Sequence, residues 1–161
     1  MIFITLGSQK FQFNRLIKAV DDQIKDNKIK DTIFAQIGAC DYIPQNFEYT
    51  DFMSRDDFSS KMNEADIVIT HGGTGAIIGA VKKGKKVIAV PRLAKYGEHV
   101  DDHQLQLIEQ FTDLDLICEC HDCDELWEKI EQVKSTTYKE YQSNTSTIIN
   151  SLEEYIGGIY G

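Results

Sequence analysis

The sequence predicts a Rossmann-like α/β domain in which helices cover both faces of a parallel β-sheet. Two observations support this fold class. Short apolar runs rich in β-branched residues alternate with longer amphipathic segments along most of the chain. The apolar runs are also continuous, which is typical of strands that are buried on both faces of a parallel sheet. We therefore expect six strands in one doubly wound sheet.

The first half of the chain supplies three strands and two helices. Residues 1–6 are a continuous apolar run and predict the first strand. Apolar residues then recur at the i, i+3, i+4, i+7 spacing of one buried helix face, at Phe13, Leu16, Ile17, Val20 and Ile24. Residues 32–37 and 47–52 are strand-like and are separated by a turn that contains Pro44. The pattern over 55–64 predicts a helix.

The second half repeats the alternation. Residues 66–70 predict a strand, and the helix that follows over about 74–83 is closed by Gly84, a residue that favours helix ends. The next strand covers 86–90 and is ended by Pro91. The remaining predicted elements are a helix over 101–111, a strand over 114–118 and a helix over 124–134.

The chain is expected to divide into a domain over residues 1–134 and a C-terminal helix and tail over 135–161. Residues 136–156 carry aromatic and aliphatic side chains between polar ones, which predicts a long helix that packs across the sheet or onto a partner. The last five residues include three glycines and are expected to fray.

The composition limits the possible functions. Of the 161 residues, 42% are hydrophobic and 27% are charged, as in an ordinary globular domain. The formal net charge of −9 argues against sequence-independent nucleic-acid binding, while backbone N–H groups can still form a local phosphate site. No apolar stretch approaches the roughly 18–20 residues of a membrane span, and the first residues lack signal-peptide features. We therefore expect a cytoplasmic protein that reaches a membrane only through a partner.

Three of the four cysteines lie close together, at Cys118, Cys120 and Cys123. A zinc site is one interpretation of this spacing. However, no second closely spaced pair accompanies them, and the segment lies between a predicted strand and a predicted helix. Reduced, partly buried thiols are therefore the favoured interpretation.

Two predicted strand ends are rich in glycine, and both lie at the carboxyl edge of the sheet, where doubly wound domains bind ligands. The first is Gly7-Ser8-Gln9, and the second is His71-Gly72-Gly73-Thr74-Gly75, which opens directly onto a helix. Small residues before a helix let backbone N–H groups approach a phosphate, whose charge the helix dipole also favours. Tight turns alone are the alternative. Neither loop has the sequence of a Walker loop or of a dinucleotide fingerprint.

A third cluster follows the fifth predicted strand and lies at the same edge. It contains Arg92 and the run Glu98-His99-Val100-Asp101-Asp102-His103-Gln104. One interpretation is an acidic helix cap at one of the two aspartates. A metal site at the two histidines, which are four residues apart, is another. Because the sequence shows no third ligand in register, we expect no metal.

Three segments in this order, residues 65–75, 84–92 and 98–104, resemble the C-terminal domain of family 28 glycosyltransferases. The resemblance covers roughly residues 1–130. In particular, the chain resembles the small subunit of two-part bacterial capsule and exopolysaccharide glycosyltransferases, and it is similar to the small catalytic subunit of the eukaryotic dolichol-linked chitobiose synthase. This resemblance implies one half of a GT-B enzyme, the half that binds the nucleotide-sugar donor.

The resemblance also implies roles for individual residues. Gly7-Ser8-Gln9 would face the donor phosphates, and the backbone of Phe52-Met53 would contact the uracil ring. His71 and the glycines after it match the position that meets the diphosphate, with His71 as the catalytic residue. His103 and Gln104 match a polar pair that touches the sugar hydroxyls. The other residues expected in the substrate site are Thr74, Arg92, Glu98 and His99.

One position departs from the family pattern. Many relatives carry a ribose-binding glutamate eight residues after the histidine, where this chain has Gly79, so ribose recognition is expected to differ. As the glycosidic bond breaks, charge develops on the β-phosphate. Backbone amides at a helix N-terminus, with His71 and Arg92, would stabilise that charge without a metal or another cofactor. The base for the acceptor hydroxyl would come from across the cleft, outside this chain.

The resemblance therefore predicts the donor-binding subunit of a two-component glycosyltransferase. This enzyme would move a hexose from a UDP-sugar to a lipid-linked saccharide acceptor in surface polysaccharide biosynthesis. A membrane-anchored, acceptor-binding partner would place the chain at the inner face of the cell membrane. The alternative is a non-catalytic subunit that stabilises such a partner. A stand-alone nucleotide-binding domain would leave residues 98–104 unexplained.

Overall fold

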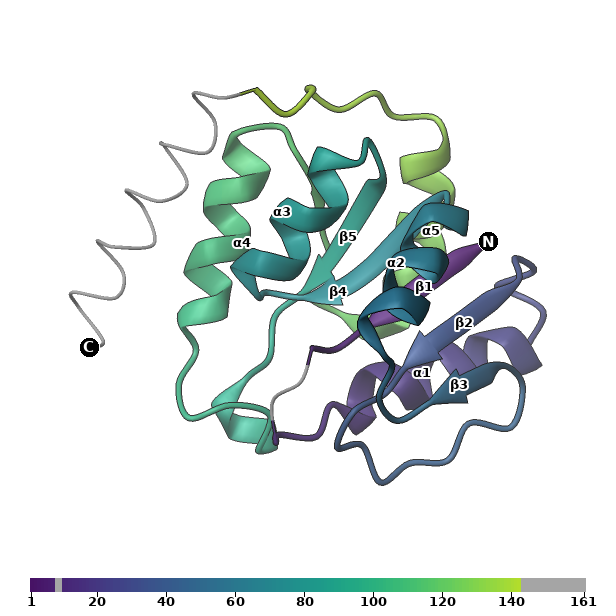
Figure 1. Cartoon of the computed structure of the whole chain (residues 1–161). Helices are drawn as coiled ribbons and strands as arrows, with labels where there is room; N and C mark the ends of the chain where they lie inside the picture. Colours follow the sequence, from purple (N-terminus) through teal and green to yellow (C-terminus); the bar gives the residue numbers. More distant parts are fainter. Residues whose placement is uncertain (8–9, 143–161) are drawn as a thin grey trace.

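The computed structural model describes residues 1–7 and 10–142 of the chain (Figure 1). Six strands form one sheet in the order β3-β2-β1-β4-β5-β6, and every neighbouring pair runs parallel. The strand order reverses between β1 and β4, which is the topological switch point of the sheet. The predicted Rossmann-like fold class is confirmed. The strand bounds are Ile2–Thr5 for β1, Ile33–Gln36 for β2, Glu48–Thr50 for β3, Ile67–His71 for β4, Lys86–Val90 for β5 and Cys118–Glu119 for β6.

Helices pack on both faces of this sheet. Helices α1 and α5 share one apolar cluster with the side chains of Ile2 and Ile4, whereas α2, α3 and α4 share the other with Phe3 (Figure 1). The alternation along β1 follows from the two-residue period of a strand. In the described part of the chain, the α-helices are Asn14–Lys25 for α1, Arg55–Glu64 for α2, Thr74–Lys82 for α3, His103–Asp113 for α4 and Leu126–Lys134 for α5.

The end of the domain differs from the predicted elements. Residues 114–117 were expected to lie in a strand, but Leu114 is the C-cap of α4 and Asp115 adopts a positive φ of 59°. The first residues of that apolar run therefore form the end of helix α4, and strand β6 contains only two residues. The helix predicted from residue 136 does not form over 136–142, and the rest of that predicted segment lies outside the described residues.

The three clustered cysteines are buried thiols. Cys118, Cys120 and Cys123 are each at most 5% exposed and are free rather than disulfide-bonded. Burial raises the pKa of Cys120 to about 12 and that of Cys123 to about 11, because the core disfavours a thiolate. All three side chains are therefore buried, more fully than the partial burial that the sequence suggested.

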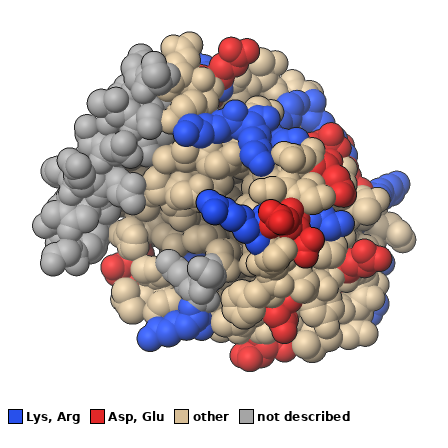
Figure 2. All heavy atoms as spheres, viewed as in Figure 1, with Lys and Arg blue, Asp and Glu red and all other residues tan. Residues whose placement is uncertain are grey.

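The surface carries charges of both signs. On the face shown in Figure 2, lysine and arginine side chains lie next to aspartate and glutamate side chains, so this face has no extended surface of one sign. Within the described residues, no helix combines the length and the apolar character that a membrane span requires.

Candidate active site

A groove of about 560 Å³ opens at the carboxyl edge of the sheet, between helices α2 and α3. Its floor includes Thr5 and Gln36, the last residues of β1 and β2, and the Thr5 hydroxyl donates to the Gln36 side-chain oxygen at 3.0 Å. Met53, Gly75 and Gly79 line its walls. The groove lies beside the topological switch point, which is where doubly wound sheets bind ligands.

The amino end of α3 faces this groove. Gly73 is the N-cap and has no side chain that could accept a hydrogen bond from the first turn. The first backbone N–H groups of a helix have no partner within the helix, so this end keeps unused donors and the positive end of the helix dipole. Gly75 and Ala76, in the first turn, line the groove. The arrangement is suited to an anion such as a diphosphate.

His71, at the end of β4, is held between two glycine loops. The side chain is 4% exposed. A Cβ atom at Gly73 would lie 2.3 Å from the imidazole Cε1, and one at Gly7 would lie 2.9 Å from Nε2. Gly7 also has a φ of +73°, which favours glycine. These two glycines are therefore required by the packing of the imidazole itself, in addition to any approach of a ligand.

Gln104, in the first turn of α4, fixes the orientation of this histidine. Its Oε1 accepts hydrogen bonds from the backbone N–H groups of Gly72 and Arg92, each at 3.0 Å. The side-chain NH₂ group then faces His71 Nδ1 at 3.4 Å. An amide that donates to Nδ1 requires the neutral tautomer with its proton on Nε2. The Nε2–H is therefore directed to the side of the ring where Gly7 lies.

His71 is uncharged at neutral pH. Burial lowers its pKa from 6.5 to about 3, and the nearby side chains of Arg92 and His99 contribute to the decrease. The imidazole can therefore stabilise an anion as a hydrogen-bond donor but not as a cation. The sequence predicted that His71 stabilises the charge that develops on the β-phosphate. A neutral ring would do so through a hydrogen bond rather than through a positive charge.

Arg92 is 1% exposed and holds both ends of the first glycine loop. Its Nη2 donates to the Leu6 carbonyl at 2.8 Å, and its Nη1 donates to the carbonyls of Phe11 and Gln12 at 3.1 and 3.2 Å. The guanidinium thus joins the segment before the loop to the segment after it. Ser8 and Gln9, which we predicted as phosphate contacts, lie outside the described residues.

Glu98 is fully buried and is paired with a residue that the sequence did not indicate. Its carboxylate accepts from Arg15 Nε and Nη2, both at 3.1 Å, and from the backbone N–H of Leu93 at 3.0 Å. Burial of a carboxylate requires such a cation. Arg15 lies 83 positions away on α1, and no local pattern marks it as the partner.

The structure shows what three residues of the expected substrate site contact within the protein. Arg92, Glu98 and Gln104 were expected to contact the substrate, and each of these buried side chains also makes hydrogen bonds with the protein, whereas Arg92 Nε is buried without a partner. Arg92 holds the start of the first glycine loop, Gln104 contacts His71, and Glu98 joins the loop after β5 to α1. The Gln104 amide, which was expected to contact the sugar, contacts the backbone of Gly72 in this structure.

The histidine pair acquires a neighbour that the sequence analysis did not recognise. Asp101 Oδ1 contacts His103 Nδ1, accepts from the His103 backbone N–H at 3.1 Å and lies 3.3 Å from His99 Nδ1. Two residues share the features of the expected acidic cap. Asp102 is the N-cap of α4, but its carboxylate accepts from Ala94 N, whereas the carboxylate of Asp101 accepts from the first backbone N–H of the helix. The statement that no third ligand stands beside the histidines was wrong.

The sequence matches the glycosyltransferase family 28 C-terminal domain over residues 1–156. The chain belongs to this family. The match extends over nearly the whole chain and includes both glycine loops, His71 and the segment around Gln104. The family 28 domain therefore includes every element that forms the groove.

Two curated relatives are similar to parts of this family 28 domain. The "UDP-N-acetylglucosamine transferase subunit ALG13" of Yarrowia lipolytica is 34% identical over 64 residues, which are 40% of this chain and 28% of the relative. The human protein of the same name is 27% identical over 118 residues, or 68% of this chain and 10% of the relative. The chain thus matches only a small part of each relative's length.

Solved structures share the fold of the domain. The glycotransferase of kitacinnamycin superposes with a TM-score of 0.62 at 16% identity, over 98% of this chain and 39% of that one. MurG of Acinetobacter baumannii gives 0.57 at 19% identity, over 83% and 41% of the two chains. SnogD from Streptomyces nogalater gives 0.54 at 17% identity, over 83% and 36%. The fold is thus that of one half of the GT-B glycosyltransferases.

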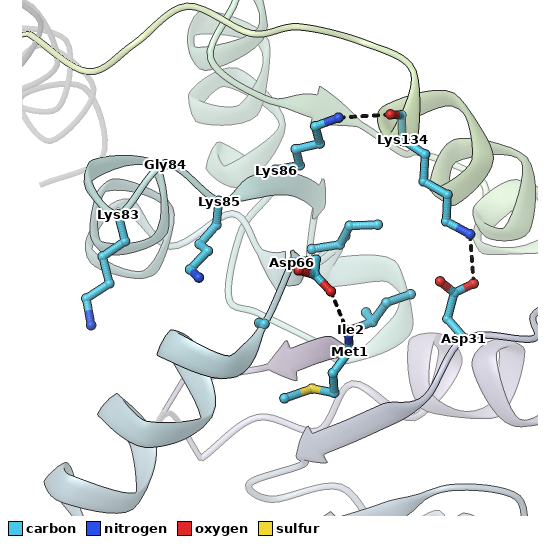
Figure 3. Close-up of a pocket in the computed structure, with 11 residues that line it drawn as sticks. Met1, Ile2, Asp31, Asp66, Lys83, Gly84, Lys85, Lys86 and Lys134 are labelled. Atoms are coloured by element: carbon cyan, nitrogen blue, oxygen red, sulfur yellow. Dashed lines mark hydrogen bonds and ion pairs between the residues drawn. The ribbon is translucent and has the colours of Figure 1, made fainter.

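A second hollow of the family 28 domain, of about 490 Å³, lies at the opposite, amino edge of the sheet (Figure 3). Four of its charged groups form two ion pairs, the N-terminal ammonium group with Asp66 at 2.8 Å and Lys134 Nζ with Asp31 at 3.0 Å. Lys86 Nζ donates to the Lys134 carbonyl at 3.0 Å. These ion pairs and this hydrogen bond connect residues at the starts of the strands with one another and with α5. Neither glycine loop reaches this edge of the sheet.

Proposed function

We propose that this chain is the donor-binding subunit of a two-component glycosyltransferase. It would transfer a hexose from a UDP-sugar to a lipid-linked saccharide in surface polysaccharide biosynthesis, together with a membrane-anchored, acceptor-binding partner. The observation that carries the proposal is the groove at the carboxyl edge of the sheet. The uncapped amino end of α3 meets the first glycine loop there, and Gly7 of this loop lies beside His71 Nε2. The names of the two curated relatives, which are transferase subunits for a UDP-sugar, support the choice of donor.

In this proposal the donor diphosphate binds at the amino end of α3. The backbone N–H groups of the first turn and the Nε2–H of His71 donate hydrogen bonds to its oxygens. Negative charge increases on the β-phosphate as the glycosidic bond breaks, so donors fixed in advance lower the barrier. Gln104 and Arg92 contribute by holding His71 and the first glycine loop in place. No described residue is assigned as the base for the acceptor hydroxyl, and we assign that group to the partner.

The uracil and sugar would lie on opposite sides of the diphosphate. Met53 lines the groove on the α2 side, and Phe52 beside it is 57% exposed, so this segment is free to contact a base. His99 and His103 flank the other side, near α4, where a sugar hydroxyl could be bound. Gly79 also lines the groove and offers no carboxylate to the ribose. The ribose would then be held by backbone groups or by the partner.

The second candidate is a non-catalytic subunit that stabilises a membrane-anchored partner. The absence of a carboxylate at Gly79 favours it, whereas the preserved donors around His71 favour donor binding. A thermal-shift screen of nucleotides and nucleotide sugars separates the two. A ligand present at a hundred times its Kd stabilises the folded state by about 2.7 kcal/mol, so UDP and one UDP-sugar should raise the melting temperature. No shift with any UDP compound would favour the stabilising subunit.

A further inference from the structure

The geometry points to a second site, a transition-metal site of the zinc class formed by His99, Asp101 and His103. Their ligand atoms, two imidazole nitrogens and a carboxylate oxygen, all lie within 4.8 Å of one another. Among the residues that the structure describes, this is the one group of three such side chains that converges in this way. The inference does not rest on the proposed glycosyltransferase function.

The first argument is an unsatisfied nitrogen. The His99 side chain is only 10% exposed, and its Nδ1 is buried without a hydrogen-bond partner, although Asp101 Oδ1 lies 3.3 Å away. A buried polar atom without a partner destabilises the folded state, because it has lost its hydrogen bonds to water. A metal ion between the nitrogen and the carboxylate would satisfy it, because a neutral imidazole nitrogen donates its lone pair to a metal.

The second argument is the spacing of the ligands. With metal–ligand bonds of about 2.0–2.1 Å, two ligands of a tetrahedral zinc ion lie about 3.3 Å apart. The distance between His99 Nδ1 and Asp101 Oδ1 is 3.3 Å. His103 Nδ1 is closer to the same oxygen, so these two atoms would move apart to admit the ion, and the neutral ring would carry its proton on Nε2 rather than on Nδ1.

The third argument is that both rings are already oriented. The imidazoles of His99 and His103 pack edge to face with their centroids 5.0 Å apart, and the ring of Phe11 packs on His99 at 5.4 Å. His103 is the first residue of α4, whereas His99 and Asp101 lie in the loop before it. An ion would thus tie the loop to the helix that carries Gln104.

The ligand set determines which metals fit. Two imidazoles with one carboxylate suit Zn²⁺, Co²⁺ or Ni²⁺, whereas Mg²⁺ and Ca²⁺ prefer oxygen ligands. Three protein ligands leave the fourth tetrahedral position for water or for an oxygen of a bound molecule.

The test is a titration with metal alone, without nucleotide. The protein is stripped with EDTA, exchanged into chelator-free buffer and titrated with Zn²⁺ in competition with a chromophoric chelator, and Co²⁺ absorption reports the coordination geometry. We expect one equivalent to bind with a Kd on the order of 1 µM or tighter, and a tetrahedral Co²⁺ spectrum. The controls are wild-type protein titrated with Mg²⁺ and the variant His121→Ala, which replaces an exposed histidine paired with Glu119.

Two ligand variants make the result specific. His103→Ala and the nearly isosteric Asp101→Asn should each weaken Zn²⁺ binding at least tenfold, whereas His121→Ala should bind as the wild type does. Circular dichroism of each variant establishes that it is folded, and Asp101→Asn preserves the test if His103→Ala is not. Absence of stoichiometric Zn²⁺ binding, an octahedral Co²⁺ spectrum, or equal affinity in wild type and Asp101→Asn would overturn the inference. Because no nucleotide is present, failure of this test leaves UDP binding untouched.

Discussion

His71 is fixed from three directions, by the two glycines that leave room for its ring and by the amide of Gln104. The sequence indicated the histidine and the glycines, because small residues beside a histidine at a strand end form a recognisable pattern. It did not indicate that the glycines serve the ring, or that Gln104 faces the backbone of Gly72. The contact of Gly7 with His71 and that of Gln104 with Gly72 join residues about 30 or more positions apart, which no local pattern encodes.

The buried, neutral state of His71 makes stability depend on pH. Its pKa is about 3 in the folded protein, against 6.5 when it is exposed in the unfolded chain. Between these values the unfolded chain binds more protons, so stability falls as the pH is lowered through 6.5. From pH 7 to pH 5 this residue should cost about 2 kcal/mol. Urea unfolding at both pH values should show a correspondingly smaller decrease for His71→Asn. An equal decrease in both proteins would contradict a buried neutral imidazole.

Removing the Gln104 side chain should affect the whole donor site. Gln104→Ala leaves the backbone N–H groups of Gly72 and Arg92 buried without an acceptor, at a cost of about 1–3 kcal/mol each. Because the same side chain also contacts His71, which we assign to the diphosphate, calorimetry should show UDP and the UDP-sugar weakened by similar factors. A loss confined to the UDP-sugar would restore the direct sugar contact that the sequence suggested.

At the level of elements, the hydrophobic periodicity predicted the bounds of a strand or helix correctly where those bounds depend only on nearby residues. The strand over 86–90 and the helix over 55–64 have the predicted bounds, because an apolar run and an N-cap at Ser54 determine them locally. The end of the domain was mispredicted for the opposite reason. Residues 114–117 are apolar enough for a strand, but the cap of α4 occupies the beginning of that run and only residues from 118 reach β5.

Helix α3 contains a glycine that its own stability does not require. Gly79 lies inside the helix, and a Cβ atom there would meet nothing within 4 Å. Alanine is more favourable than glycine in a helix interior, so Gly79→Ala should raise the free energy of unfolding by about 0.5–1 kcal/mol. Chemical denaturation measures this directly. A destabilised variant would mean that the wall of the groove is packed more tightly than the structure shows.

At the scale of the whole molecule, the chain provides one Rossmann-like half with a groove at the carboxyl edge of its sheet, and it spans 36–41% of the solved glycosyltransferase chains that it resembles. The fold class was predictable because the alternation of strands and helices extends along most of the sequence. The long-range ion pair between Arg15 and Glu98 was not predictable, because their positions along the chain carry no signal of contact.

The proposed division of labour predicts how activity depends on a partner. The isolated chain should transfer no sugar to a lipid-linked acceptor, since we assign the acceptor site and the base to the other subunit. Activity should appear when the chain is added to membranes of the source organism that lack it but retain the partner. Transfer of radiolabelled sugar into the lipid fraction measures this. Turnover by the purified chain alone would rule out the two-component proposal.

The central claim is that the amino end of α3 binds the diphosphate of UDP. Calorimetry in EDTA should detect UDP binding by the wild-type chain. Gly75 offers a sharp test, because a Cβ atom there meets nothing within 4 Å and a first-turn aspartate favours the helix. Gly75→Asp should therefore fold but bind UDP at least about tenfold more weakly, a cost of about 1.4 kcal/mol, while the neutral, isosteric Gly75→Asn should lose far less. Absence of UDP binding by the wild type, or equal affinity in Gly75→Asp and Gly75→Asn, would contradict the claim.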